Sequence, residues 1–246
     1  LYFRAFDEKF IEEIRSYAIN YFRKILSNLG WEPQKSDKHT DALLRTFTIS
    51  VLGKMNDDTV TDDAIRKYQK FLKSPSSLSP DLIETICSIA AWNGNSKTFA
   101  ELKKLYTNAK TMEEKLRFLG AMCGFQDKKL LVRTLNFSQT SEVRSQNMQL
   151  PIMKVAGNPY GEKVLWPWLK KNWKNINKKV GHGNPLFNRI VASIAGVADD
   201  SMEKEIKLFF KNNPTPGTER TQSQTLERIR INSKFLRTMR KEFKNG

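Results

Sequence analysis

Histidine and cysteine are the side chains best suited to metal or nucleophilic chemistry, and this 246-residue chain has two of each. His39 and His182 have no second histidine at helical spacing, so no zinc site of a known pattern is present. The simpler interpretation places both histidines on the surface beside turns. Cys87 and Cys123 lie in apolar stretches without a neighbouring histidine, which favours buried free thiols in a reducing compartment. We therefore expect no catalytic residue and no metal ligand in this chain.

Paired carboxylates could act as a general acid and base, and the chain has several such pairs. They mostly precede apolar-periodic segments, where negative charge stabilises the start of a helix. The pairs are Glu12-Glu13, Asp57-Asp58, Asp62-Asp63 and Asp199-Asp200. We expect them to cap helices.

The segment 157–161 contains two glycines but lacks the Lys-Ser/Thr of a phosphate-binding loop. It predicts a turn.

An aromatic and basic run extends from Trp166 to Lys174 and could bind nucleic acid, because aromatic rings stack on bases and lysines contact phosphates. Its spacing favours a packed amphipathic helix instead. The apolar face comprises Leu165, Trp168, Leu169, Trp173 and Ile176, whereas Lys170, Lys171 and Lys174 lie mostly elsewhere. We therefore expect the aromatic side chains in the core.

The elements that would position these residues are helices, since apolar residues recur every three or four positions along nearly the whole chain. The predicted helices cover residues 10–29, 38–53, 61–72, 80–92, 96–109, 111–123, 127–137, 140–156, 160–176, 185–197, 200–211 and 219–243. Gly30 ends the first of them, Thr111 and Glu114 form a capping pair, and 212–217 must be a loop. Asn232 interrupts the apolar stripe of the last helix and should hydrogen-bond to a neighbouring element.

This succession predicts an all-α fold of consecutive antiparallel helix pairs that form an armadillo- or HEAT-like superhelical bowl. The aromatic alternation in residues 2–6 predicts a short N-terminal strand remnant.

The net charge is +16, and residues 163–246 carry 18 Lys and Arg against 7 Asp and Glu. Such a field could attract nucleic acid, anionic lipid or acidic peptides. No apolar run approaches the roughly 20 residues that cross a bilayer. The chain begins at Leu1 without an initiator Met or a signal peptide, so we expect it to start within a longer, cytoplasmic protein.

Several motifs, in their order and spacing, resemble one known domain. They are Asn158 to Gly161, Trp166 to Trp173, Phe209-Phe210 and Gln224 to Asn232, including Glu227, together with 2–7, 29–32, 43–45 and 142–144. The chain resembles the C-terminal helical domain of the M1 (gluzincin) zinc aminopeptidases over essentially its whole length. It departs from that family at Glu162-Lys163, where an arginine usually follows the glycine. Within the family it is most similar to the archaeal tricorn-interacting aminopeptidase factors.

The resemblance implies that this chain is one domain of a longer enzyme whose catalytic residues lie in another domain. Residues 1–6 would end a preceding β domain or linker, and residues 7–246 would form the C-terminal helical-repeat domain. The zinc motif HExxH and the GxMEN motif belong to a separate catalytic domain, and this sequence contains neither. The chain alone is therefore not expected to be an enzyme, and its cofactor, zinc, would lie in the parent protein's catalytic domain. The domain would close the peptide chamber. Its partners would be the upstream catalytic domain and peptide substrates, and we expect it to bind neither a membrane nor nucleic acid.

Basic residues on the last helices would then attract the carboxylates of a bound peptide. The candidates are Arg189, Arg228 and Arg230, because arginine forms a two-pronged pair with carboxylate. The structural alternative for each is a solvated helix face. The alternative function is a free-standing basic helical-repeat module that binds nucleic acid or protein.

Overall fold

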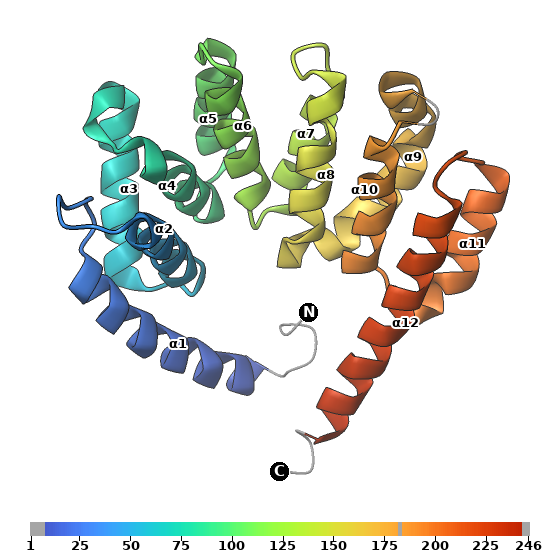
Figure 1. The fold of residues 1–246 in the computed structure, drawn as a ribbon, viewed down its shortest axis with the longest axis horizontal. Coiled ribbons are helices and arrows are strands. Elements are labelled where there is room, and N and C mark those ends of the chain that lie inside the picture. The colour runs from blue at the N-terminus through green and yellow to red at the C-terminus, as the bar shows by residue number, and fades with distance from the viewer. Residues whose placement is uncertain (1–7, 182–183, 243–246) are drawn as a thin grey trace. The chain divides into compact units, whose positions relative to one another are not determined.

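The computed structural model describes residues 8–181 and 184–242 (Figure 1). These residues form twelve α-helices joined by turns and short 3-10 helices, and they contain no β-strand, which confirms the all-α class. The predicted strand at 2–6 and His182 lie outside the described residues. Throughout these two ranges, every helix is too short or too polar to cross a membrane.

The helices form two compact units, one ending at Phe125 and the other beginning at Gln126. We call residues 8–125 the first unit and residues 126–242 the second unit. The sequence pointed to 212–217 as a break, and residues 213–218 form a loop between two helices of the second unit. The predicted single helical domain and its bowl shape stay predictions.

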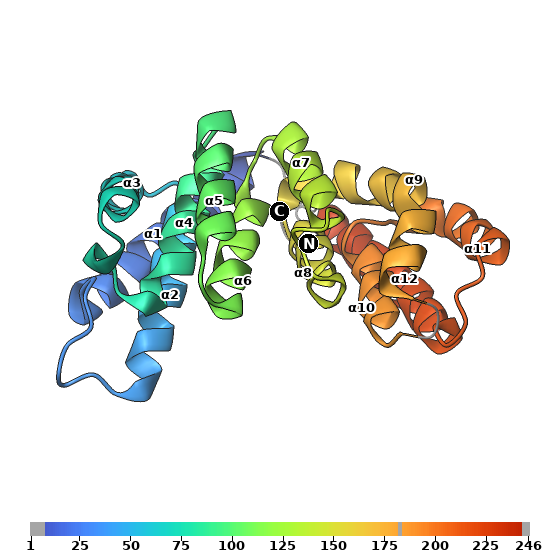
Figure 2. The ribbon, with the colours of Figure 1, turned by 90° about the horizontal axis from the view of Figure 1, so that it is seen from above.

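The first unit is organised around a 13-residue central helix. Its helices are α1 (Glu8–Leu29), α2 (His39–Lys54), α3 (Asp58–Lys73), α4 (Pro80–Trp92), α5 (Ser96–Asn108) and α6 (Met112–Ala121). The central helix, α4, contacts α2, α3, α5 and α6, and Leu82, Ile86 and Ile89 are almost fully buried. Cys87 on the same helix is buried, as is Cys123, and both thiols are free, as predicted. α5 and α6 lie side by side, which Figure 2 shows from above.

Local signals set the helix ends of this unit. Gly30 ends α1 with a φ of 66°, a left-handed conformation that glycine adopts without strain. The Thr111 hydroxyl accepts a hydrogen bond from the Glu114 amide at 3.2 Å, and the Glu114 carboxylate accepts one from the Thr111 amide at 3.1 Å. This capping box confirms the predicted start of α6.

Of the paired carboxylates, two pairs cap helices and two do not. Asp57 accepts a hydrogen bond from the Val60 amide at the start of α3, and Asp199 accepts one from the Ser201 amide at the start of a 3-10 turn. The prediction was wrong for Asp62-Asp63 and Glu12-Glu13, because each pair lies inside a helix rather than at its start. There Asp63 pairs with Arg66, and Glu12 pairs with Arg15.

The second unit packs around a 19-residue helix rich in tryptophan. Its helices are α7 (Lys128–Ser138), α8 (Gln149–Ala156), α9 (Glu162–Val180), α10 (Leu186–Ser193), α11 (Glu203–Asn212) and α12 (Glu219–Glu242). Trp166 and Trp173 on α9 are each 2% exposed and meet Phe209 edge to face, with ring centroids 5.1 and 5.3 Å apart. Trp168, also buried, donates a hydrogen bond to Asn136 on α7 at 2.8 Å. The core placement of the tryptophans is confirmed, and Trp166 joins them although it lies off the predicted stripe.

The turn before α9 depends on a glycine and an asparagine. The Asn158 side chain accepts a hydrogen bond from the Tyr160 amide at 2.9 Å, and the Gly161 amide donates to the Asn158 carbonyl at 2.8 Å. A Cβ at Gly161 would lie 1.9 Å from the Val155 carbonyl oxygen. The backbone therefore approaches the end of α8 more closely than any side chain allows, and the segment is a turn as predicted.

The helix predicted over 140–156 is wrong in its first half, because α8 begins at Gln149 and a short 3-10 helix at Ser145–Asn147 precedes it. The Lys179 ammonium donates hydrogen bonds to the carbonyls of Ser138, Thr140 and Val143 at 3.0, 2.6 and 2.7 Å. These carbonyls thus have a cationic partner from α9, and the Thr140 carbonyl also accepts a hydrogen bond from the Val143 amide at 3.3 Å.

Candidate functional site

α12 packs on α10 through one face of its own helix. Thr225, Ile229, Ser233 and Leu236 are buried at spacings of three and four residues, which is one side of a helix. On α10, the buried residues are Phe187, Ile190 and Val191. This packing fixes α12 beside α10 and determines which of its side chains remain at the edge of the contact.

Polar side chains along this edge tie α12 to α10 and to the 3-10 helix Ile194–Gly196 that follows α10. The Thr221 hydroxyl donates to the Asn188 side-chain oxygen at 2.6 Å, and the Asn232 amide donates to the Ala195 carbonyl at 3.2 Å. The second bond confirms that Asn232 links the last helix to a neighbouring element. The Thr225 hydroxyl donates to the carbonyl of Thr221, one turn earlier, at 2.7 Å.

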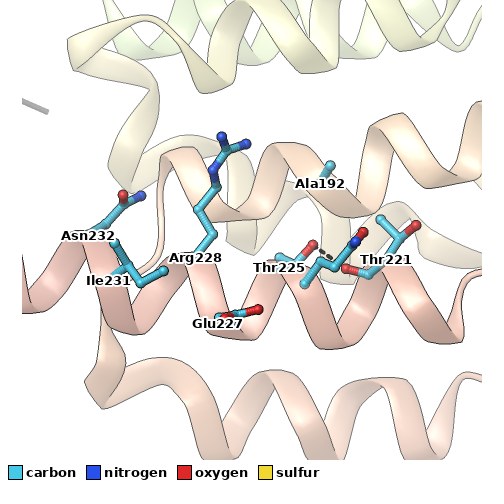
Figure 3. Close-up of a pocket in the computed structure, with 8 residues that line it drawn as sticks. Ala192, Thr221, Thr225, Glu227, Arg228, Ile231 and Asn232 are labelled. Carbon is cyan, nitrogen blue, oxygen red and sulfur yellow. Dashed lines mark hydrogen bonds between the residues drawn. The ribbon is translucent and has the colours of Figure 1, made fainter.

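A groove of about 650 Å³ lies at this edge (Figure 3). It is lined by Ala192 of α10 and by Thr221, Gln224, Thr225, Glu227, Arg228, Ile231 and Asn232 of α12. The lining offers hydroxyl and amide groups, one cation, one carboxylate and an apolar side chain. Such a lining can hydrogen-bond to a polar ligand and can pair with an anion through its one cation.

Arg228 is the cation of this groove. Among the residues that the structure describes, it has no hydrogen bond or ion pair, and its side chain is exposed. Arg228 and Asn232 project from the same side of α12, whereas Glu227 projects from another side (Figure 3). An arginine presents five N–H donors and can hold a carboxylate with two parallel hydrogen bonds. The geometry therefore leaves this guanidinium available to an anionic ligand.

The other two candidate arginines lie elsewhere. Arg230 points to α11, where its Nε and Nη2 donate to the Glu203 carboxylate at 2.8 and 2.5 Å. Hydrogen bonds from Arg230, and then from Lys207, lower the pKa of Glu203 to about 2. Arg189 is exposed on α10, and its Nη1 lies 3.5 Å from the Gln149 side-chain oxygen on α8. The structure thus brings Arg228, Glu227 and Asn232 together and leaves the other two arginines outside the groove.

Sequence reasoning missed the uncharged part of the groove. Thr221, Gln224, Thr225 and Ile231 lie three or four residues from one another or from Arg228, so a helical projection around Arg228 would have identified them. Ala192 comes from another helix, and no local pattern connects it with α12. The remaining predicted motif residues, Asn158, Gly161, Trp166 and Trp173, belong to the turn and core described above.

The described residues show no clustering of three or more His, Cys, Asp or Glu side chains that could hold a metal ion. Burial raises the pKa of the Cys87 thiol well above its ordinary value, which makes it a poor metal ligand and nucleophile.

Comparisons with known proteins give the family. A family model described as the ERAP1-like C-terminal domain matches residues 2–231. Aminopeptidase M1-D of Oryza sativa subsp. japonica is 30% identical over 234 residues, covering 94% of this chain and 27% of that protein. Aminopeptidase M1 of Arabidopsis thaliana is 27% identical over 241 residues, which cover 96% of this chain and 27% of that protein. Aminopeptidase 2, mitochondrial, of Saccharomyces cerevisiae is 26% identical over 232 residues, which cover 92% of this chain and 24% of that protein.

The chain spans about a quarter of the length of these relatives. They come from plants and a yeast, and the predicted archaeal affinity stays a prediction. The match over residues 2–231 confirms the resemblance to M1 aminopeptidases, and the chain belongs to the ERAP1-like C-terminal domain family.

Proposed function

We propose that this chain is the non-catalytic C-terminal domain of a cytoplasmic M1 zinc aminopeptidase. The observation that carries the proposal is the family match over residues 2–231, together with relatives that are about four times as long. Zinc and the cleavage of the peptide bond would belong to the part of the protein outside this sequence. The buried free thiols fit a reducing compartment such as the cytoplasm.

We further propose that the domain closes the chamber in which the enzyme holds its peptide and that the α10–α12 groove binds the far end of that peptide. A substrate held by its amino end at the catalytic domain would present its terminal carboxylate to this domain. Arg228 suits that carboxylate because its guanidinium is exposed, lines a groove and has no carboxylate partner among the described residues. Asn232 and Gln224 would add amide groups beside it.

The alternative of a nucleic-acid-binding module finds less support in the second unit. The tryptophans that would stack on bases are buried, with exposures of 2–5%. Several of the exposed cations are already paired with carboxylates, among them Arg230 with Glu203 and Lys170 with Glu205. Arg189 and Arg230 stay candidate substrate residues outside the groove.

The test uses the full-length aminopeptidase and two forms of one peptide, with a free C-terminal carboxylate or a C-terminal amide. We expect the amide to have a lower kcat/KM, and we expect Arg228→Ala to remove most of that difference. A charge pair at an open surface is worth about 1 kcal/mol, or roughly a fivefold change in kcat/KM.

Arg220→Ala is the matched control, because Arg220 is an exposed arginine on the same helix and does not line the groove. An aminoacyl-coumarin, which lacks a distant carboxylate, should be hydrolysed equally by all three proteins. Equal acid-to-amide ratios in the wild type and Arg228→Ala would reject the role of Arg228, and equal effects of both substitutions would indicate a general field rather than a site.

A further inference from the structure

The first helix of the chain is long and apolar on one side, and its own unit buries that side only in part. Among the 22 residues of α1, Leu26 alone is buried, whereas the 19-residue α9 buries eight residues. Figure 1 shows the amino-terminal half of α1 extending away from α2, α3 and α4. α1 packs on α2, but its exposed apolar side chains gain no stability from that packing and suit a partner surface.

The exposed apolar side chains of α1 continue onto α2. We define the α1–α2 apolar patch as Ile14, Tyr17, Tyr21, Leu43, Leu44 and Phe47, with exposures between 38% and 74%. Phe22 joins the two helices, since its ring meets Tyr21 at 5.4 Å and Phe47 at 5.8 Å, both edge to face. The patch is therefore one surface on two helices.

The clustering of this patch sets it apart from apolar residues scattered singly over a surface. Among the described residues, eleven large apolar side chains are exposed, and six of them belong to this patch. Because a whole aromatic side chain presents roughly 150–250 Å², the six partly exposed side chains offer on the order of 500 Å². A typical monomer has no apolar patch larger than about 300–600 Å², and patches of this size often serve in binding.

We propose that the α1–α2 apolar patch is the docking surface for the part of the aminopeptidase that precedes this domain. The inference rests on the proposed function, because that preceding part is the partner. Nearly three quarters of the length of the relatives lies outside the matched region, and the family is that of a C-terminal domain. The patch is formed by α1 and α2, the helices that are nearest to that preceding part in the sequence.

Covalent attachment, rather than area, favours this partner over a second copy of the chain. A stable complex between separate proteins buries about 800 Å² on each partner, a little over half of it apolar, and the apolar area of the patch is close to that amount. A covalently attached domain has an effective concentration on the order of millimolar, so a smaller apolar contact can hold it in place.

The test is the accessibility of single introduced cysteines in this 246-residue chain and in the full-length aminopeptidase. Tyr17→Cys reports on the patch, and Leu208→Cys is the control, because Leu208 is 57% exposed on α11 of the second unit. The native Cys87 and Cys123 are buried and give a low background. Maleimide labelling would be followed by mass mapping of the α1 and α11 peptides.

We expect Tyr17→Cys to be labelled at least about tenfold more slowly in the full-length protein than in this chain, because labelling would then require local opening. Leu208→Cys should react at similar rates in both. Equal rates for Tyr17→Cys would overturn the proposal, as would equal protection of both positions. Protection of Tyr17→Cys in this chain that grows with protein concentration would assign the patch to a second copy.

Aminopeptidase activity, measured on the same full-length sample, separates the docking surface from the proposed function. An active enzyme with an unprotected Tyr17→Cys rejects only the docking surface. An inactive protein rejects the proposed function.

Discussion

Replacing Lys179 by methionine removes an ammonium group that three backbone carbonyls share. Its Nζ lies 3.0, 2.6 and 2.7 Å from the carbonyl oxygens of Ser138, Thr140 and Val143. Methionine keeps most of the aliphatic side chain and loses the three donors, so the substitution tests the hydrogen bonds rather than the packing.

The expected loss follows from the exposure of these carbonyls. A hydrogen bond to a charged group contributes about 1.5–3 kcal/mol when it is buried. The contacts to Ser138 and Val143 are part-buried, and the contact to Thr140 is exposed. We therefore expect each bond to contribute about 1 kcal/mol or less and the substitution to lower the free energy of unfolding of the second unit by about 2–3 kcal/mol.

Urea denaturation monitored by tryptophan fluorescence measures this change, because three of the five tryptophans lie in the second unit. Hydrogen exchange of amides in residues 138–148 should accelerate in the same variant. Lys178→Met is the control, since Lys178 is an exposed neighbour on the same helix. A free energy of unfolding for Lys179→Met within about 0.5 kcal/mol of the control would refute the reasoning, because surface substitutions have effects of that size.

Three further predictions concern the turn, the ion pairs and a helix cap. Gly161→Ala should lower the free energy of unfolding by at least about 1–3 kcal/mol in urea denaturation, because its Cβ would meet the Val155 carbonyl oxygen at 1.9 Å; unchanged stability would contradict the close approach. The ion pairs of Glu203 lower its pKa from 4.5 to about 2. Its contribution to the stability of the folded protein is therefore complete above pH 4.5 and is lost as the pH falls toward 2. Glu203→Gln should therefore flatten the fall in stability over this range, measured by thermal denaturation, and an equally steep fall would argue against the pairing with Arg230. Thr111→Ala should lower the free energy of unfolding by about 1 kcal/mol, because α6 loses its cap. A loss below a few tenths of a kcal/mol, measured by urea denaturation, would exclude the capping box.

Local patterns predicted the parts of the fold that depend on neighbours in sequence. The stop at Gly30, the capping box at Thr111 and the buried face of α9 each rest on a few adjacent residues. Where the first half of the helix predicted over 140–156 is missing, the carbonyls of Thr140 and Val143 accept hydrogen bonds from Lys179, which comes from a different helix. Arg45 is a second example, because its buried guanidinium donates to the Leu29 and Gly30 carbonyls across a loop, and no periodic pattern indicates such a contact.

For the candidate site, too, the sequence predicted only what depends on residues close to one another in the chain. Arg228, Glu227 and Asn232 are close in sequence on one helix, and they line one groove. Arg230 was equally plausible from its residue type, yet Glu203 on another helix pairs with it. The apolar stripe of α1 predicted the helix correctly, but the sequence could not show that Ile14, Tyr17 and Tyr21 stay exposed in the described unit.

The most direct test of the central claim compares this chain with the full-length protein in two assays, hydrolysis of aminoacyl-coumarin substrates and zinc content. The account predicts activity and one bound zinc in the full-length protein, with neither in the 246-residue chain. Stoichiometric zinc or peptidase activity in the chain alone would contradict its role as a non-catalytic domain. Absence of both from the full-length protein would contradict its assignment to an aminopeptidase.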